Sequence, residues 1–152
     1  MYLLTENTAE IACPVSVAYE YITNLETFGE WFPGVIAIES ANELAHAAPG
    51  KTYLETVSIP MRGTRKVAIT AVAAEPHKLF VTEGKLPPLM PRMEIQFHAI
   101  DSNACRVVWR MFSRNDQFLA RITFLPLASR VMRKRAAIGM QRLAKVLEGR
   151  RA

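Results

Sequence analysis

The sequence predicts an α+β protein in which an antiparallel sheet of seven strands is covered by one long C-terminal helix. Six strand-like segments lie between residues 35 and 114, separated by short polar or proline-rich turns. One alternating strand and two short helices precede them, and residues 117–151 carry apolar side chains at helical spacing. We expect one domain over residues 1–152, because this length suits a single hydrophobic core.

The first strand is predicted over residues 5–13, where apolar and polar side chains alternate. Pro14 ends this strand and opens a helix, because proline fits the first helical turn. The apolar line of this helix consists of Val17, Tyr21 and Leu25. A second short helix is predicted over residues 25–31, and it stops before Pro33, which disfavours helical geometry in the residue that precedes it.

The six strands of the meander are predicted over 35–44, 52–59, 65–74, 79–86, 92–100 and 106–114. Alternation predicts the inward-facing side chains of three of them. In the strand 65–74 they are Val67, Ile69, Ala71 and Ala73, and in the strand 92–100 they are Met93, Ile95, Phe97 and Ala99. In the last strand they are Cys105, Val107, Trp109 and Met111. The strands 52–59 and 79–86 do not alternate cleanly, and either register places a polar group inside. The choices are Glu55 or Thr56, and Thr82 or Glu83. Pocket walls and edge strands both have such a pattern.

The C-terminal helix has an unusual apolar stripe, formed by Leu119, Ile122, Ala128, Met132, Ala136, Gly139, Leu143 and Val146. Glycine inside a helix costs about 1 kcal/mol relative to alanine. Gly139 and the small neighbours therefore indicate a helix that runs close to the sheet or leaves room beside itself. Pro126 predicts a kink or a fresh start near residues 125–126.

The net charge of +5 is concentrated in this helix. From Gln117 onward the chain has nine Lys/Arg residues and one acidic residue, a net charge of +8. Residues 1–116 have ten Lys/Arg residues and thirteen acidic residues, a net charge of −3. The exposed cations are expected to be Arg130, Arg133, Lys134, Arg142 and Lys145. They suit an anionic membrane surface or another acidic partner, and a solvated helix flank is the alternative. No specific nucleic-acid partner is predicted.

Composition and motifs exclude several classes of function. No apolar run of 18 residues and no N-terminal signal pattern occur, so we expect a soluble cytoplasmic protein with Cys13 and Cys105 reduced. The histidines His46, His77 and His98 lack metal-ligand spacing, and neither a nucleophile elbow nor a glycine-rich phosphate loop is present. We therefore predict neither a metal nor a cofactor.

Three motifs carry a family resemblance. They are Ile11-x-Cys13-Pro14, then Glu30-Trp31-Phe32-Pro33-Gly34-Val35, and Leu143-Ala144-Lys145-Val146-Leu147-Glu148. In order, they resemble the strand-to-helix junction, the second-helix exit and the helix terminus of the START/Bet v 1-like (SRPBCC) superfamily, in its polyketide cyclase/dehydrase and lipid-transport branch. The resemblance covers essentially the whole chain.

This resemblance implies a helix-grip fold, in which a curved sheet holds the C-terminal helix across its concave face with an apolar cavity between them. It also implies that the first and last strands pair, so that Cys13 and Cys105 lie close together. A rigid empty cavity of about 300 Å³ would cost roughly 7 kcal/mol. The cavity is therefore expected to be hydrated, collapsible or occupied.

The predicted ligand-binding residues are Trp31, Phe32, Val67, Ile69, Met93, Phe97, Val107, Trp109, Met132, Ala136, Gly139 and Met140. Trp31 and Phe32 are expected at the cavity mouth, opposite a loop that contains Pro87, Pro88 and Leu89. Ordinary core packing is the alternative for each of these residues.

Two main hypotheses of function follow, with a third beside them. The favoured one is a non-enzymatic carrier or sensor of a hydrophobic small molecule, such as a lipid, a quinone or a polyketide-like aromatic. The alternative is an aromatase/cyclase that uses one inward acid-base group, chosen from Glu83, Glu55 and Arg65, since burial raises the pKa of a carboxyl. The third is an interaction module that uses the basic helix.

Overall fold

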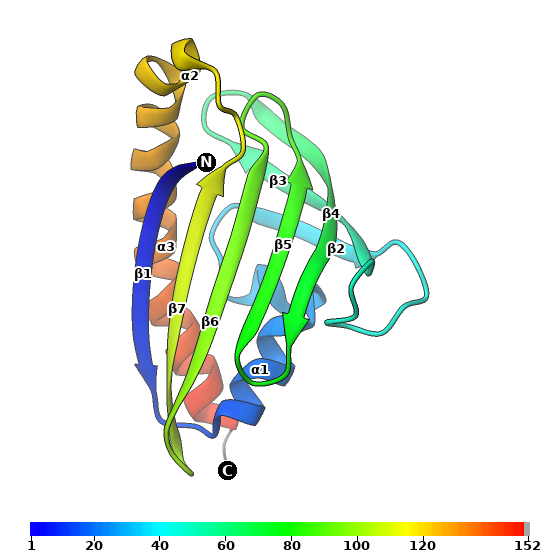
Figure 1. Ribbon diagram of the computed structural model, residues 1–152, viewed down its shortest axis with the longest axis vertical. Helices are drawn as coiled ribbons and strands as arrows, with labels where there is room; N and C mark the ends of the chain where they lie inside the picture. The colour runs from blue at the N-terminus through cyan, green and yellow to red at the C-terminus, as the bar shows by residue number, and fades with distance from the viewer. Residues whose placement is uncertain (151–152) are drawn as a thin grey trace.

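The computed structural model describes residues 1–150 and has the predicted α+β architecture (Figure 1). Its elements are β1 (Tyr2–Ile11), α1 (Val15–Thr23), the 3-10 helix η1 (Leu25–Glu30), β2 (Val35–Ser40), β3 (Thr52–Ile59), β4 (Gly63–Glu75), β5 (Leu79–Lys85), β6 (Pro91–Asp101), β7 (Ala104–Ser113), α2 (Phe118–Ile122) and α3 (Phe124–Arg150). All seven predicted strands are present, and both short helices follow β1, so the predicted fold class is confirmed.

The strands form one antiparallel sheet in the order β1-β7-β6-β5-β4-β3-β2. The last strand pairs with the first, and the curved sheet stays open between β1 and β2 (Figure 1). Helix α3 packs along β1, whereas α1 packs against β6 and β7. The β3–β4 turn, the β5–β6 connection and α2 lie at one end of the long axis, which we call the α2 end (Figure 1).

The two ambiguous strands turn Glu55 and Thr82 inward, and both side chains are buried. Glu55 pairs with Val67 across β3 and β4, and Thr82 pairs with Met93 across β5 and β6. Directly paired residues share a face of the sheet. The polar groups therefore lie among the apolar side chains of the concave face.

The C-terminal segment is not one continuous helix. Its first turn, α2, ends at Thr123, and a new helix begins at Phe124, so Pro126 lies in the first turn of α3. This confirms the predicted fresh start, because proline is tolerated where its missing N–H would have no helical partner. The prediction that Leu119 and Ile122 face the core was wrong, since both side chains are exposed. Arg151, which was predicted within the helix, lies outside the described residues.

The predicted proximity of Cys13 and Cys105 is confirmed. Ile11 pairs with Cys105 in the β1–β7 ladder, so the end of β1 meets the start of β7. Both cysteines are buried thiols. Burial, together with the neighbouring Cys13, raises the pKa of Cys105 to about 12. Within residues 1–150, none of the helices combines the length and the apolar character needed to cross a membrane.

Gly139 allows a close approach of α3 to the segment that follows η1. A Cβ atom added there would lie 3.1 Å from Cδ2 of Phe32 and 3.3 Å from the carbonyl oxygen of Trp31. The contact is with the segment that follows η1 rather than with the sheet. Phe32 in turn packs against Phe28 and Trp109, with ring centroids 5.0 and 5.2 Å away.

We expect Gly139→Leu to lower the free energy of unfolding by about 1–3 kcal/mol, because the added side chain must displace Phe32 or push α3 outward. Urea unfolding followed by circular dichroism measures this change. The matched control is Gly149→Leu in the same helix, where an added Cβ meets no atom within 4 Å. Equal stability of the two variants would show that Gly139 is not a tight contact.

Candidate functional site

An apolar cavity lies between the concave face of the sheet, η1 and the first half of α3. It has two compartments of about 50 and 60 Å³. Their shared walls are Phe28, Glu55, Val67, Pro91 and Met111. The first compartment adds Leu25, Ile69, Thr82, Gly84 and Met93, and the second adds Phe32, Val35, Val57, Leu86, Leu89, Met132 and Arg135.

The cavity is small for a ligand-binding pocket. Pockets for drug-sized ligands begin at roughly 300 Å³, and the two compartments together reach less than half of this volume. Each compartment is large enough for a few water molecules, since one water needs about 10–15 Å³ of such space. Three methionines, Met93, Met111 and Met132, form part of the wall. Their unbranched side chains can change rotamer, so this wall is able to adapt.

Glu55 is the carboxyl group of this cavity. Its side chain is 7% exposed and borders both compartments. Burial raises the pKa of Glu55 to about 7 because the apolar surroundings disfavour the carboxylate, and the positive charge of Arg135 offsets only part of this effect. Near neutral pH the carboxyl is therefore present in both forms, and it can either donate or accept a proton.

Arg135 reaches the cavity from α3, on the opposite wall. Its Nη2 donates a hydrogen bond of 2.9 Å to the carbonyl oxygen of Ser58, and its guanidinium covers Gly34. A Cβ atom at Gly34 would lie 2.5 Å from Nη1 of Arg135, and the φ of +89° at this position also favours glycine. Burial lowers the pKa of Arg135, and Glu55 opposes this shift.

Five of the predicted ligand-binding residues line the cavity, namely Phe32, Val67, Ile69, Met93 and Met132. The other seven do not line it and are buried in the core: Trp31, Phe97, Val107, Trp109, Ala136, Gly139 and Met140. Six of them lie further from the α2 end along the same strands and the same helix, and Trp31 follows η1. The aromatic rings around Phe32 fill the space between sheet and helix there.

Trp31 does not lie at an opening, in contrast to its predicted place at the mouth. It is 1% exposed and packs edge-on against Phe28, because the chain after η1 turns this ring into the core. Leu89, from the predicted opposite loop, does line the cavity, whereas Pro87 and Pro88 are exposed. The β5–β6 connection thus supplies part of the cavity wall.

Two of the three candidate acid-base groups lie outside the cavity. Glu83 follows the inward Thr82 and therefore faces away, where its carboxylate pairs with Arg92 at 2.7 Å and Arg114 at 3.5 Å. Arg65 is exposed near the β3–β4 turn, because the strand extends beyond the helix-covered part of the sheet there. Glu55 is the candidate that the fold places inside.

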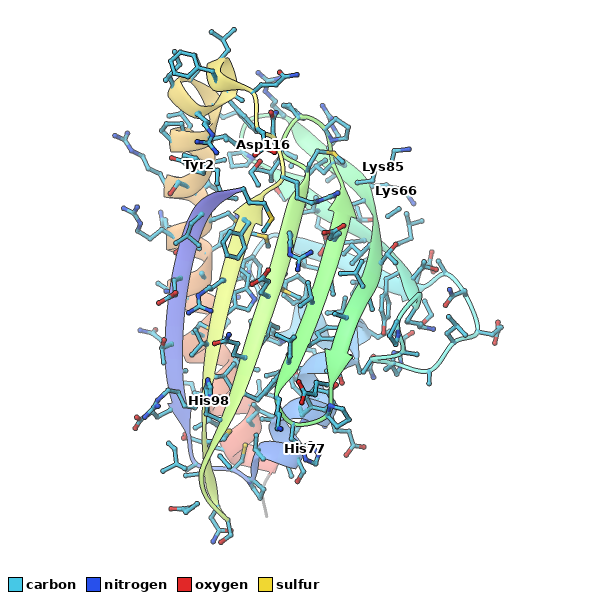
Figure 2. The ribbon with its side chains drawn as sticks, in the orientation of Figure 1. Tyr2, Lys66, His77, Lys85, His98 and Asp116 are labelled. Carbon is cyan, nitrogen blue, oxygen red and sulfur yellow. The ribbon has the colours of Figure 1, made fainter. Side chains whose placement is uncertain are left out.

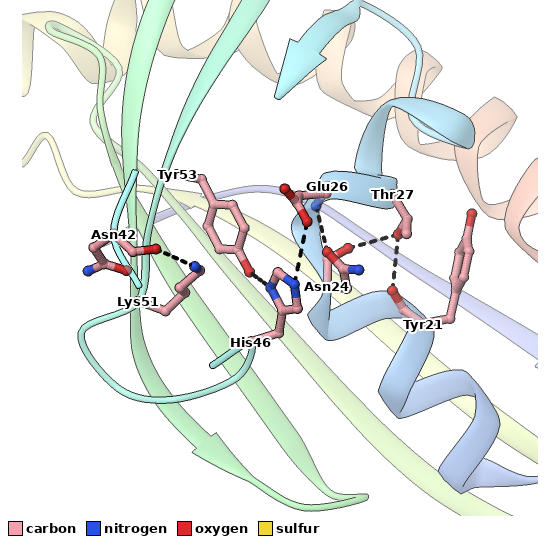
Figure 3. Close-up of polar contacts among 8 residues, drawn as sticks. All are labelled: Tyr21, Asn24, Glu26, Thr27, Asn42, His46, Lys51 and Tyr53. Atoms are coloured by element: carbon pink, nitrogen blue, oxygen red, sulfur yellow. Dashed lines mark hydrogen bonds and ion pairs between the residues drawn. The ribbon is translucent and has the colours of Figure 1, made fainter. Parts of the chain in front are cut away.

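A second group of polar side chains fastens the 41–51 loop to η1 (Figure 3). His46 Nδ1 is hydrogen-bonded to the hydroxyl of Tyr53, and its Nε2 lies 3.5 Å from the carboxylate of Glu26. Burial raises the pKa of Tyr53 to about 12. Tyr53 and His46 do not border either cavity compartment, so we interpret this group as a structural clasp.

The sequence reasoning missed several residues of the cavity wall. Phe28 and Leu25 belong to η1, and Leu86 follows β5. Arg135 was named neither among the exposed cations nor among the ligand-binding residues. Helical spacing alone could have found Arg135, which lies three residues after Met132. Among residues 1–150 no cluster of three or more His, Cys, Asp or Glu side chains could hold a metal ion.

We expect Glu55 to make the stability of the protein depend on pH. Its folded pKa of about 7 lies above the unfolded value near 4.5. The unfolded chain therefore loses this proton first, and the contribution of Glu55 to stability is complete below pH 4.5 and is lost as the pH rises through 7. Relative to Glu55→Gln, the wild-type protein should lose about 3 kcal/mol between these limits.

Urea unfolding of the wild-type protein and of Glu55→Gln between pH 4.5 and 8 measures the difference between their free energies of unfolding. The contributions of all other titrating groups cancel in this difference, because both proteins contain them. A constant difference across this range would contradict a raised pKa.

The sequence matches the model of one protein family, described as polyketide cyclase/dehydrase and lipid transport, over residues 4–148. No curated protein sequence matches the chain.

Solved structures share the fold at low sequence identity. The Zhui aromatase/cyclase from Streptomyces sp. R1128 is 14% identical, with a TM-score of 0.71 over 96% of this chain and 93% of that one. A protein from Thermus thermophilus has 10% identity and a TM-score of 0.76, over 97% and 99% of the two chains. A START superfamily protein from Mycobacterium smegmatis has 14% identity and a TM-score of 0.63, over 97% and 95%. At this level of identity the structures establish the fold alone, whereas the family match spans nearly the whole sequence. The chain therefore belongs to the polyketide cyclase/dehydrase and lipid transport family.

Proposed function

We propose that this protein binds and carries a hydrophobic small molecule in the cavity between the sheet and α3. The observation that carries the proposal is the apolar cavity itself, lined by three methionines and by the β5–β6 connection. The family description, which includes lipid transport, supports the same function. The cavity as it stands is contracted, so the ligand enters by displacing side chains of the methionine wall.

The cavity chemistry suits an apolar molecule that bears one neutral polar group. Glu55 in its protonated form donates a hydrogen bond to a carbonyl oxygen, and in its ionised form it accepts one from a hydroxyl. The hydroxyl of Thr82 lies in the same compartment. A ligand with a ketone, quinone or phenol group would thus pair with these side chains while its hydrocarbon part fills the rest.

The second candidate function is catalysis of an aromatase/cyclase type. The observation that favours it is the pKa of Glu55, about 7, because a general acid or base is most effective near the pH at which it operates. The structural similarity to an aromatase/cyclase adds the fold on which such chemistry occurs. Glu83 and Arg65 drop out of this candidate because neither lies in the cavity.

An anionic partner at the basic flank of α3 is an additional proposal. Arg130, Arg133, Lys134, Arg142 and Lys145 are all at least partly exposed. Their charges attract a negatively charged surface without any involvement of the cavity.

For the carrier function we expect Val67→Phe to reduce the uptake of the fluorescent apolar probe Nile red by about ten-fold or more, since the larger ring occupies volume that both compartments share. The free energy of unfolding should change by less than about 1.5 kcal/mol, because the ring fills existing space. The matched control is Val72→Phe, an exposed position on the same strand, which should leave uptake unchanged.

Mass spectrometry of organic extracts of the purified protein complements this test. The carrier proposal fails if the wild-type protein takes up no probe and its extracts contain no apolar molecule, or if both phenylalanine variants bind the probe equally well.

For the catalytic candidate, the wild-type protein should convert a poly-β-ketone substrate to a cyclised product. Glu55→Gln should then lower turnover by about 100-fold or more, because it removes the acid-base group while keeping a similar shape. Chromatography of the products measures this, and Nile red uptake by the variant shows that its cavity is intact. Absence of product with the wild-type protein would leave the carrier function alone.

A further inference from the structure

We propose that the α2 end of the molecule docks on an anionic lipid bilayer, with apolar side chains of α2 and the start of α3 inserted among the lipid headgroups. This inference rests on the proposed carrier function for its biological purpose, since the ligand would pass between bilayer and cavity. The docking itself is independent of any ligand in the cavity.

The first support is an apolar helix that the fold leaves uncovered. Helix α2 has no buried residue, although four of its five side chains are apolar. Phe118, Leu119 and Ile122 are 74%, 68% and 57% exposed, and Leu127 of α3 is 61% exposed. Met61, at the tip of the β3–β4 turn, is also fully exposed at the same end of the molecule. Apolar groups clustered at one projecting end mark an interaction surface.

The second support is the charge around these apolar groups. Exposed cations come from three segments that meet at the α2 end. The β3–β4 turn and the start of β4 supply Arg62, Arg65 and Lys66, and the end of β5 supplies Lys85. Helix α2 and the first half of α3 supply Arg121, Arg130, Arg133 and Lys134. Figure 2 shows Lys66 and Lys85 toward this end, with His77 and His98 at the other. Two acids lie near these cations, and both are already paired. Asp116 lies 3.5 Å from the N-terminal amino group and 3.9 Å from Arg121, and Glu83 lies 2.7 Å from Arg92 and 3.5 Å from Arg114. No acid occurs from Gln117 to Leu147.

Charge complementarity decides between the possible occupants of this surface. A second copy of the chain in a two-fold contact would bring the same cations face to face, which is unfavourable. An anionic bilayer offers phosphate groups to the cations and hydrocarbon to the apolar side chains, as interfacial helices require. Helix α2 also lies at the very end of the long axis of the molecule (Figure 1), a position that suits contact with a planar surface.

The third support is a direct connection between this surface and the cavity wall. The segment that leads into α2 holds the β5–β6 connection by hydrogen bonds. Ser113 Oγ donates to the carbonyl oxygen of Leu89 at 2.5 Å, and Asn115 Nδ2 donates to that of Pro88 at 2.8 Å. Leu89 and Leu86 line the cavity. A bilayer that contacts α2 therefore lies next to this part of the cavity wall.

The test is co-sedimentation of the full chain with vesicles of phosphatidylcholine, either pure or mixed with phosphatidylserine, at low and high salt. We expect binding to the anionic vesicles that weakens with salt. The double substitution L119S/I122S should reduce partitioning by about ten-fold or more, because it removes the inserted apolar groups. In the double substitution R130E/K134E, the loss of each cation should reduce partitioning to the anionic vesicles by about five-fold.

Matched controls place the same changes away from the α2 end. I100S alters an exposed apolar side chain at the opposite end, and R142E/K145E reverses two cations in the second half of α3. I100S should bind the anionic vesicles to within about two-fold of the wild-type protein. R142E/K145E should weaken binding less than R130E/K134E does, because Arg142 and Lys145 belong to the same basic flank but lie further from the docked end, where their charges are more strongly screened. All altered side chains are exposed, so the urea midpoints should agree.

Three results would overturn the proposal. The first is equal binding to anionic and neutral vesicles, or none. The second is an effect of R142E/K145E as large as that of R130E/K134E, which would indicate a contact along the whole helix. The third is a lipid-free dimer in analytical ultracentrifugation that L119S/I122S abolishes, which would make the α2 end an interface between copies.

Nile red uptake without lipid separates this proposal from the carrier function. All four variants should take up the probe as the wild-type protein does, because none alters the cavity. Vesicle binding without probe uptake would remove the carrier function and leave the docking in place.

Discussion

The contact between Gly139 and Phe32 decides how the space between the sheet and α3 is divided. Glycine lets the helix approach the segment after η1 closely enough for the Phe32 ring to lie between helix and sheet, packed on Trp109. On the side away from α2 the interior is closely packed. On the α2 side the cavity begins, with Phe32 in its wall, although α3 stays attached to β1 there through a hydrogen bond from Ser129 Oγ to the carbonyl oxygen of Leu4. Phe32 thus marks the boundary between the closely packed part of the interior and the cavity.

This division explains which of the predicted ligand-binding residues border the cavity. Period-two alternation identifies the inward face of a strand, and it placed Val67, Met93 and Met111 correctly toward α3. It gives no information on the level along the strand at which packing becomes loose. Met93 borders the cavity whereas Phe97 does not, although both are inward residues of β6. That level depends on aromatic rings from η1, a distant segment, so the sequence of β6 alone could not reveal it.

The C-terminal segment shows a second limit of sequence patterns. Leu119 and Ile122 continue the spacing of the later stripe, which predicted that they face the core. The break at Thr123 and the new start before Pro126 change the phase of the helix, and these side chains become exposed. Arg135 is the opposite case, since it belongs to a run of cations and yet turns toward the cavity. Its charge marks it as a surface candidate, whereas its helical spacing from Met132 indicates the inner face.

The energetics of the cavity favour a contracted state that can be filled. At about 24 cal/mol per Å³, each compartment costs only about 1 kcal/mol when empty, against roughly 7 kcal/mol for a rigid pocket of ligand size. Ionised Glu55 adds a second cost, because burial disfavours its carboxylate and the positive charge of Arg135 offsets only part of this effect. A ligand that donates a hydrogen bond to Glu55 would remove that cost. It would at the same time replace the lost contacts of Met93, Met111 and Met132 as they move aside. Both terms favour occupation, because the contracted cavity gains contacts and a hydrogen-bond partner for Glu55 when it is filled.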